Sequence, residues 1–108
     1  MKMPTSDSYR ESLIESLKDA EHAGDFIGAI LEEKDPEPAF MRNAIRKVIE
    51  ARIRMNALSE SAKQHHEKLD KMLTESGGLE IYSLVALLEA LGFKLGITVE
   101  DGCVGAGL

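Results

Sequence analysis

Residues 55–73 read MNALSESAKQHHEKLDKML. Apolar residues recur along this stretch at helical spacing: Leu58, Ala62, Leu69, Met72 and Leu73. The spacing predicts two short helices joined by a tight turn at Lys63 and Gln64. A helix-turn-helix over about residues 55–75 would follow, in which one helix braces a second that enters the major groove of DNA.

The turn of this predicted motif is made of unusual residues. Glycine is common at such a turn because the backbone has positive φ, so Lys63 would cost about 1 kcal/mol there. Gln64 takes a place that an apolar residue usually fills. Two outcomes stay open: the turn forms at that cost, or the first helix runs on past Lys63 and the turn shifts.

The charge of the chain is unevenly distributed around this stretch. The 108 residues suit one compact domain, with 44% apolar residues, 30% charged residues and a net charge of −6. The net charge is −5 over residues 1–35, +2 over 36–75 and −3 over 76–108. Basic residues gather just before the motif: Arg42, Arg46, Lys47, Arg52 and Arg54. This segment is either a solvated helix face or a surface that contacts phosphates.

Helical periodicity continues on the N-terminal side of the motif. Ser8 and Asp19 are the expected N-caps of the first two helices. The Asp35-Pro36 step separates the second helix from a third, which carries a wide apolar stripe from Phe40 to Ile49.

The C-terminal side has its own helix signals. Gly77-Gly78 ends the helix that holds the motif, and Ser83 is the expected cap of a last helix that bears leucines and stops at Gly92. Residues Lys94–Val99 alternate weakly and predict a short strand, and this segment and the last helix are the first candidates for a dimer surface.

These signals together predict an all-α fold. We expect a small bundle of five to six helices with the helix-turn-helix inside it and the short strand near the C-terminus. The expected organisation is a flexible N-terminus over 1–7, one helical domain over 8–99 and a disordered tail over 100–108.

Several classes of function lack their usual residues. No apolar run is long enough to span a membrane, and the single Cys103 favours a reduced, cytoplasmic setting. His65 and His66 point about 100° apart on a helix, which makes a shared metal ion improbable. We find no phosphate-binding glycine loop and no nucleophile beside a base, so we predict no enzyme and no cofactor.

The chain resembles a known family in five ordered segments. These segments are SYRESLIESLKD, AILEEKDPE, AIRKVIEAR, MNALSES and LVALLEALGFKL. Their order is similar to that of bacterial addiction-module antidote proteins, which are HigA-like antitoxins with a lambda-repressor-like (XRE) helix-turn-helix. The resemblance covers roughly residues 4–97 and departs from the family pattern mainly at Lys63, Gln64 and Asp70.

This resemblance implies a cytoplasmic homodimer that neutralises a RelE/ParE-like toxin protein, binds operator double-stranded DNA and represses its own operon. The residues expected to contact DNA are Arg52, Arg54, Lys63, Gln64, His65, His66, Lys68 and Lys71. Glu67 and Asp70 would face the groove among them and oppose phosphate binding. The alternative is a protein-binding module, a toxin neutraliser or dimer, whose degenerate helix-turn-helix no longer reads DNA.

Overall fold

A computed structural model describes residues 6–100 of the chain, and every regular element in that part is an α-helix. The helices are α1 (Ser6–Ser16), α2 (Ala20–Leu31), α3 (Phe40–Arg54), α4 (Glu60–Ser76) and α5 (Leu79–Ala90). The all-α prediction is therefore confirmed, with five helices in the described residues.

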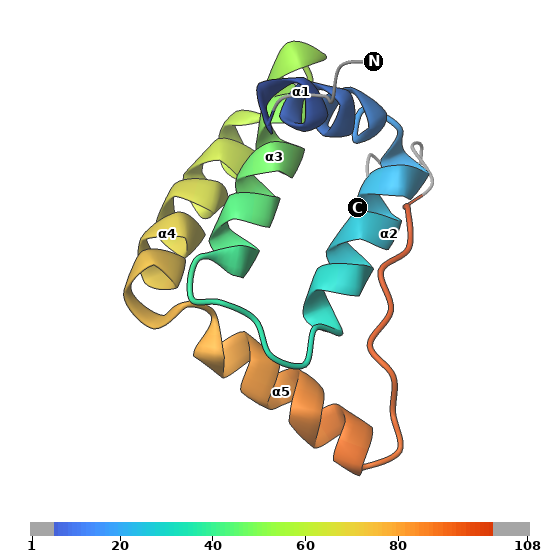
Figure 1. Ribbon diagram of the computed structural model, residues 1–108, viewed down its shortest axis with the longest axis vertical. Coiled ribbons are helices and arrows are strands. Elements are labelled where there is room, and N and C mark those ends of the chain that lie inside the picture. The colour runs from blue at the N-terminus through green and yellow to red at the C-terminus, as the bar shows by residue number, and fades with distance from the viewer. Residues whose placement is uncertain (1–5, 101–108) are drawn as a thin grey trace.

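Helix α3 is the centre of the bundle. It packs against α1, α2 and α4, whereas α5 contacts mainly α2. Figure 1 shows α2, α3 and α4 running along the molecule, with α1 across one end and α5 across the other. After α5 the chain turns back along α2, where a Cβ on Gly24 would lie 3.6 Å from the Cγ2 of Ile97.

The helix ends follow local side-chain chemistry. The Asp19 carboxylate accepts hydrogen bonds from the backbone N–H groups of Glu21 and His22 at 2.9 and 3.2 Å, which confirms it as the N-cap of α2. Gly77 ends α4 in the left-handed conformation at φ 70°, again as expected. Asn56 ends α3 with φ 56°, a conformation that asparagine tolerates better than most residues.

The helix break predicted at Lys63 and Gln64 is absent. Ser59 caps α4 by accepting a hydrogen bond from the backbone N–H of Ala62 at 3.0 Å, and the helix then runs unbroken to Ser76. Lysine and glutamine are both good helix formers, and residues 60–76 contain neither glycine nor proline. The helix-turn-helix predicted over about residues 55–75 is therefore wrong in its local structure.

The pairing of α3 with α4 is an antiparallel hairpin. Arg46 contacts Asp70, and one turn earlier on α3 Arg42 contacts Thr74 on the following turn of α4. Such a register arises when two helices run in opposite directions side by side. The longer α3 and α4 thus occupy the sequence in which a short bracing helix and a reading helix were expected.

The ends of the chain also differ in detail from the prediction. Helix α1 begins at Ser6 and α5 at Leu79, each before its expected cap, and residues 93–100 contain no regular element. The short strand predicted over Lys94–Val99 is therefore wrong. The predictions for residues 1–5 and for 101–108, which include Cys103, lie outside the described residues.

The apolar core consists of two clusters. The first contains Ile14, Leu17, Ala23 and Ala51, and the second contains Ile30, Met41, Ala44 and Leu73. Phe26 on α2 packs against both clusters and joins them. The small side chains of Ala44 and Ala51 let neighbouring helices approach α3 closely, and the large side chains around them fill the space between the helices.

Arg54 at the end of α3 holds α1 in place. Its two Nη atoms donate to the two carboxylate oxygens of Glu11 at 2.8 and 2.9 Å. Its Nη1 also reaches Glu15 at 3.3 Å, and its Nε donates to Glu50 at 3.2 Å. Three carboxylates thus surround one guanidinium group, a geometry that arginine supports better than lysine.

These ion pairs predict acid-sensitive stability. The hydrogen bond from Arg54 holds the pKa of Glu11 below its ordinary value of 4.5, and the hydrogen bond from Arg46 holds the pKa of Asp70 below 3.8. Carboxylates with lowered pKa values contribute stability above their unfolded pKa values, which is lost as the pH falls through the folded values. We expect the urea midpoint to be level from pH 7 to about 5 and to fall below pH 4.5.

The variant Arg54→Met keeps an apolar stem but removes the guanidinium group. Its urea midpoint should lie below that of the parent protein at pH 7, and the difference should shrink as the pH falls and Glu11 becomes protonated, because protonated Glu11 no longer gains from Arg54. A difference between the two proteins that does not change with pH would show that Arg54 acts only through packing.

Candidate protein-docking surface

The residues predicted to contact DNA lie at the end of α3 and along α4. Their environments differ, because some are solvated and some are engaged within the bundle. Exposed on α4 are Lys63, Gln64, His65, Lys68 and Lys71, whereas Arg52, Arg54 and His66 are half-buried. The structure therefore places the five α4 residues on a solvent-facing surface and sets the other three apart from it.

Arg54 is already occupied by protein carboxylates. The three glutamates around it satisfy its Nε and both Nη atoms. A phosphate would have to displace these partners, and the ion-pair contact between α1 and α3 would be lost. Arg54 therefore acts as a structural residue in this conformation.

Asp70 also turns inward. The Arg46 Nε and Nη2 atoms donate to its two carboxylate oxygens at 2.7 and 2.8 Å, which forms a bidentate bridge between α3 and α4. The Nε2 of His66 lies 3.8 Å from the same carboxylate. The expectation that Asp70 faces a DNA groove is therefore wrong, and the residue instead fixes the register of the hairpin.

The outward half of α4 carries balanced charge. Its three exposed lysines, at 63, 68 and 71, alternate with the exposed carboxylates of Glu60, Glu67 and Glu75. Affinity for nucleic acid depends mainly on neutralising phosphates, and this surface offers no excess of positive charge. Alternating charges at such spacing are typical of a solvated helix face.

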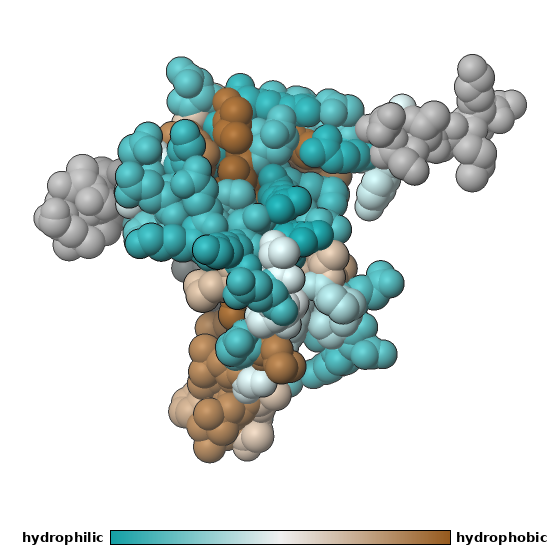
Figure 2. Space-filling model, turned by 90° about the vertical axis from the view of Figure 1, so that its left-hand side faces the viewer, coloured by the Kyte–Doolittle hydropathy of each residue, from teal (hydrophilic) through white to brown (hydrophobic). Residues whose placement is uncertain are grey.

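The most apolar surface of the described residues is on α5. Leu84, Leu87 and Leu91 are 52%, 54% and 61% exposed. Their spacing of three and four residues places them on one face of the helix, which we call the α5 stripe. Figure 2 shows an apolar region at the end of the molecule that α5 occupies, whereas hydrophilic residues cover most of the opposite end in that view.

The α5 stripe lies beside a groove that continues toward α4. This groove has a volume of about 450 Å³ and is lined on the α4 side by Leu69, Met72 and Leu73, and on the α5 side by Ile81. Met72 lines this groove and is 56% exposed. Apolar surface of this extent in a small protein usually marks a binding site.

The sequence shows these leucines at helical spacing, but it does not show whether they face the bundle or the solvent. Val85 is 6% exposed and, with the half-buried Ile81 and Tyr82, forms the side of α5 that faces the bundle. A buried stripe and an exposed stripe have the same helical spacing, so periodicity alone does not distinguish them.

Other kinds of site lack support in the described residues. Residues 6–100 contain no cluster of three histidine, cysteine or acidic side chains that could hold a metal ion. Within the same range, none of the helices is both long and apolar enough to cross a bilayer. Comparison with protein-family models, characterised proteins and solved structures gives no significant match to this chain.

Proposed function

We propose that this chain is a protein-binding module, and that the α5 stripe is the surface on which a second copy of the chain docks. The observation that supports this function is the exposure of Leu84, Leu87 and Leu91, each more than half accessible on a single helix face. Removing such side chains from water stabilises a complex by roughly 25 cal/mol for each Å² of apolar surface buried.

The geometry of α5 suits pairing with a helix of its own kind. Apolar residues at i, i+3 and i+7 form the narrow seam through which two helices pack. Lys94 lies beyond the end of α5 and is 3.6 Å from Glu32 of its own chain, so the contact between two copies would depend on the three leucines of the seam.

The resemblance to antidote proteins suggests a second partner for the same molecule. In that proposal the dimer neutralises a basic toxin of the RelE/ParE-like class. The net charge of −5 over residues 1–35 supports it, since an acidic surface accelerates the encounter with a basic protein.

Operator binding is the alternative function, and the geometry favours it less. It would have to use the three exposed lysines of an unbroken helix, at 63, 68 and 71, with Glu67 between them and Glu60 and Glu75 on either side. Binding to promoter DNA with a steep salt dependence that Lys68→Ala/Lys71→Ala weakens would favour the alternative. Binding that is absent, or equal for all DNA sequences, would favour the protein-binding module.

The docking proposal is tested by the mass of the protein in solution. We expect sedimentation equilibrium to give a dimer at micromolar concentration and a monomer for Leu87→Glu at the same concentration, because the variant buries a charge in the seam. Leu87 is 54% exposed in the single chain, so the variant should keep its fold, as its circular dichroism spectrum would show.

Ile53→Glu is the matched control. Ile53 lies on α3, away from the stripe, and is also 54% exposed, so the change in charge and apolar area is the same. This variant should remain a dimer. A parent protein that stays monomeric at about 100 μM, where associations of −5.5 kcal/mol or stronger are populated, would contradict the proposal.

A further inference from the structure

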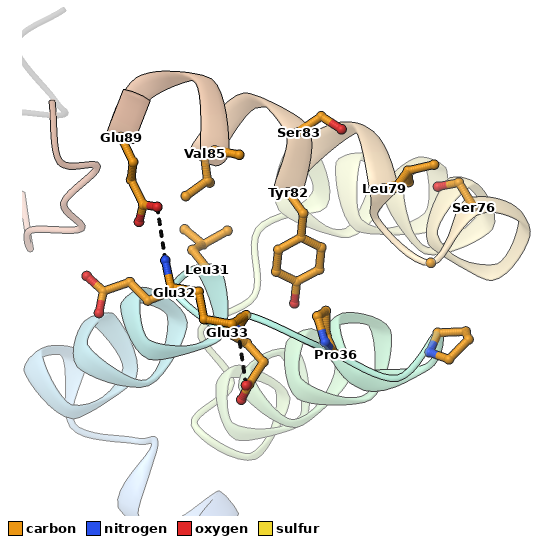
Figure 3. Close-up of a pocket in the computed structure, with 14 residues that line it drawn as sticks. Leu31, Glu32, Glu33, Pro36, Ser76, Leu79, Tyr82, Ser83, Val85 and Glu89 are labelled. Atoms are coloured by element: carbon orange, nitrogen blue, oxygen red, sulfur yellow. Dashed lines mark hydrogen bonds and ion pairs between the residues drawn. The ribbon is translucent and has the colours of Figure 1, made fainter. Parts of the chain in front are cut away.

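A second cleft lies on the other side of α5 (Figure 3). It has a volume of about 470 Å³ and is bounded by the end of α2, the connection from 32 to 38 and α5. Apolar side chains form much of its wall, and charged side chains stand at its rim. Leu31, Pro36, Tyr82 and Val85 belong to the wall, and Glu32, Glu33, Lys34 and Glu89 belong to the rim.

The cleft and the α5 stripe are separate surfaces. Tyr82 and Glu89 are seven residues apart and so share one side of α5, and Leu84 and Leu91 are likewise seven apart. The two pairs are offset by two residues, which rotates them by about 200° around the helix axis. A partner in the cleft would therefore leave the stripe open.

Hydrogen bonds and an ion pair connect the elements that line the cleft. The Tyr82 hydroxyl donates to the carbonyl oxygen of Ile30 at 3.2 Å, which fixes the ring between α5 and the end of α2. The Lys34 Nζ lies 3.0 Å from the Glu89 Oε1 and links the connection to α5, and the backbone N–H of Lys34 donates to Glu33 Oε1 at 3.2 Å. Because the shape is already formed, an occupant loses little free energy to ordering it.

The rim has an excess of negative charge. Lys34 balances Glu89, and Lys94 lies 3.6 Å from Glu32. Glu33 has no cationic side chain within 4 Å among residues 6–100, so its charge stays uncompensated. Burial and the nearby Glu33 both raise the pKa of Tyr82, which agrees with a negative, partly desolvated wall.

We infer that this cleft docks a short extended segment of another protein, in which apolar side chains alternate with arginine or lysine. Its apolar side chains would pack against Tyr82 and Pro36, and its cation would pair with Glu33. A second copy of this chain is a poor source, because its densest basic segment is folded into α3, where Arg46 and Arg54 are already paired. The inference goes beyond the proposed self-association, which uses the opposite side of α5.

The probe for this site is a five-residue peptide of alternating arginine and leucine, capped at both ends. In a nitrogen–proton NMR titration of the full chain, we expect shifts for the backbone amides around Glu33, Tyr82 and Glu89 and little change around Leu91. A peptide with glutamate in place of arginine is the control and should not bind, because the rim repels it. Equal binding of both peptides, or shifts centred elsewhere, would overturn the inference.

Two variants distinguish the contribution of the rim charge to peptide binding from the contribution of the space in the cleft. Glu33→Gln should weaken binding of the arginine peptide about two- to five-fold at low salt, as expected for one exposed ion pair, whereas Glu75→Gln on α4 should leave it unchanged. Ala86→Phe fills the cleft from an exposed position on α5 and should abolish binding. Unchanged affinity in both Glu33→Gln and Ala86→Phe would contradict the assigned site.

The same titration distinguishes the two proposals. Leu87→Glu should lose the dimer and keep the peptide, because its side chain is on the stripe. A parent protein that forms the dimer but does not bind the peptide would contradict only the cleft as a docking site. A parent protein that binds the peptide but remains monomeric would contradict only the proposed self-association.

Discussion

Leu73→Ala is expected to lower the free energy of unfolding by about 2–5 kcal/mol, which is a large part of the stability of a domain of this size. Leu73 is 2% exposed and packs with Ile30, Met41 and Ala44 in the second core cluster. It is the buried residue that α4 contributes to this cluster. Removal of its side chain leaves a cavity that three separate helices would have to close, so little relaxation is expected. Urea unfolding followed by circular dichroism measures the change.

The neighbouring residue provides the control. Met72 is 56% exposed, so Met72→Ala should change the free energy of unfolding by no more than about 0.5 kcal/mol. Leu69→Ala should fall between the two, since Leu69 is half-buried and packs on the rim of the same cluster. Equal effects at 72 and 73 would show that α4 is rotated about its axis relative to α3.

The local features of the fold could be predicted because single residues determine them. Asp19 caps a helix through its own carboxylate, and Gly77 and Gly92 stop helices because they adopt positive φ without strain. Such signals depend on a few neighbouring residues, so these helix ends can be predicted without knowledge of the tertiary structure. Asn56 gives a similar signal at the end of α3 and was missed, since asparagine takes this conformation less often than glycine.

The direction of each helix face could not be predicted in the same way. On α4, Leu69, Met72 and Leu73 lie close together in sequence, and which of them is buried depends on where α3 packs. The error at Lys63 has a related cause. The apolar spacing was interpreted as a turn there, whereas lysine and glutamine have a high helix propensity, and α4 continues as a helix through both residues.

Only part of the candidate site could be predicted from the sequence, for the same reason. The sequence predicted a last helix that bears leucines, and that helix was a first candidate for a dimer surface. The cleft on its other side was not foreseen, because it forms only where Tyr82 meets the connection after α2, about fifty positions earlier in the chain. A site made from such distant segments leaves no pattern of spacing in the sequence.

Gly77→Ala is expected to destabilise the protein by about 2–4 kcal/mol, through two effects that act together. Gly77 has φ +70°, a conformation that strains any residue with a Cβ atom. The added Cβ would also lie 3.0 Å from the carbonyl oxygen and 3.2 Å from the Cα of Pro38, and these backbone atoms cannot rotate away. The α4–α5 corner would have to move from the connection that lines the cleft.

Two other glycines separate these effects. Gly92 has φ +90°, and a Cβ added to it would meet nothing within 4 Å, so Gly92→Ala should cost only the conformational strain, about 1 kcal/mol. Gly28 lies inside α2 with equally open space, so Gly28→Ala should stabilise the protein by about 0.5–1 kcal/mol. The urea midpoint should therefore be highest for Gly28→Ala, lower for Gly92→Ala and lowest for Gly77→Ala. A Gly77→Ala variant no less stable than Gly92→Ala would mean that Pro38 does not press against this corner, and that the cleft wall is free to shift with α5.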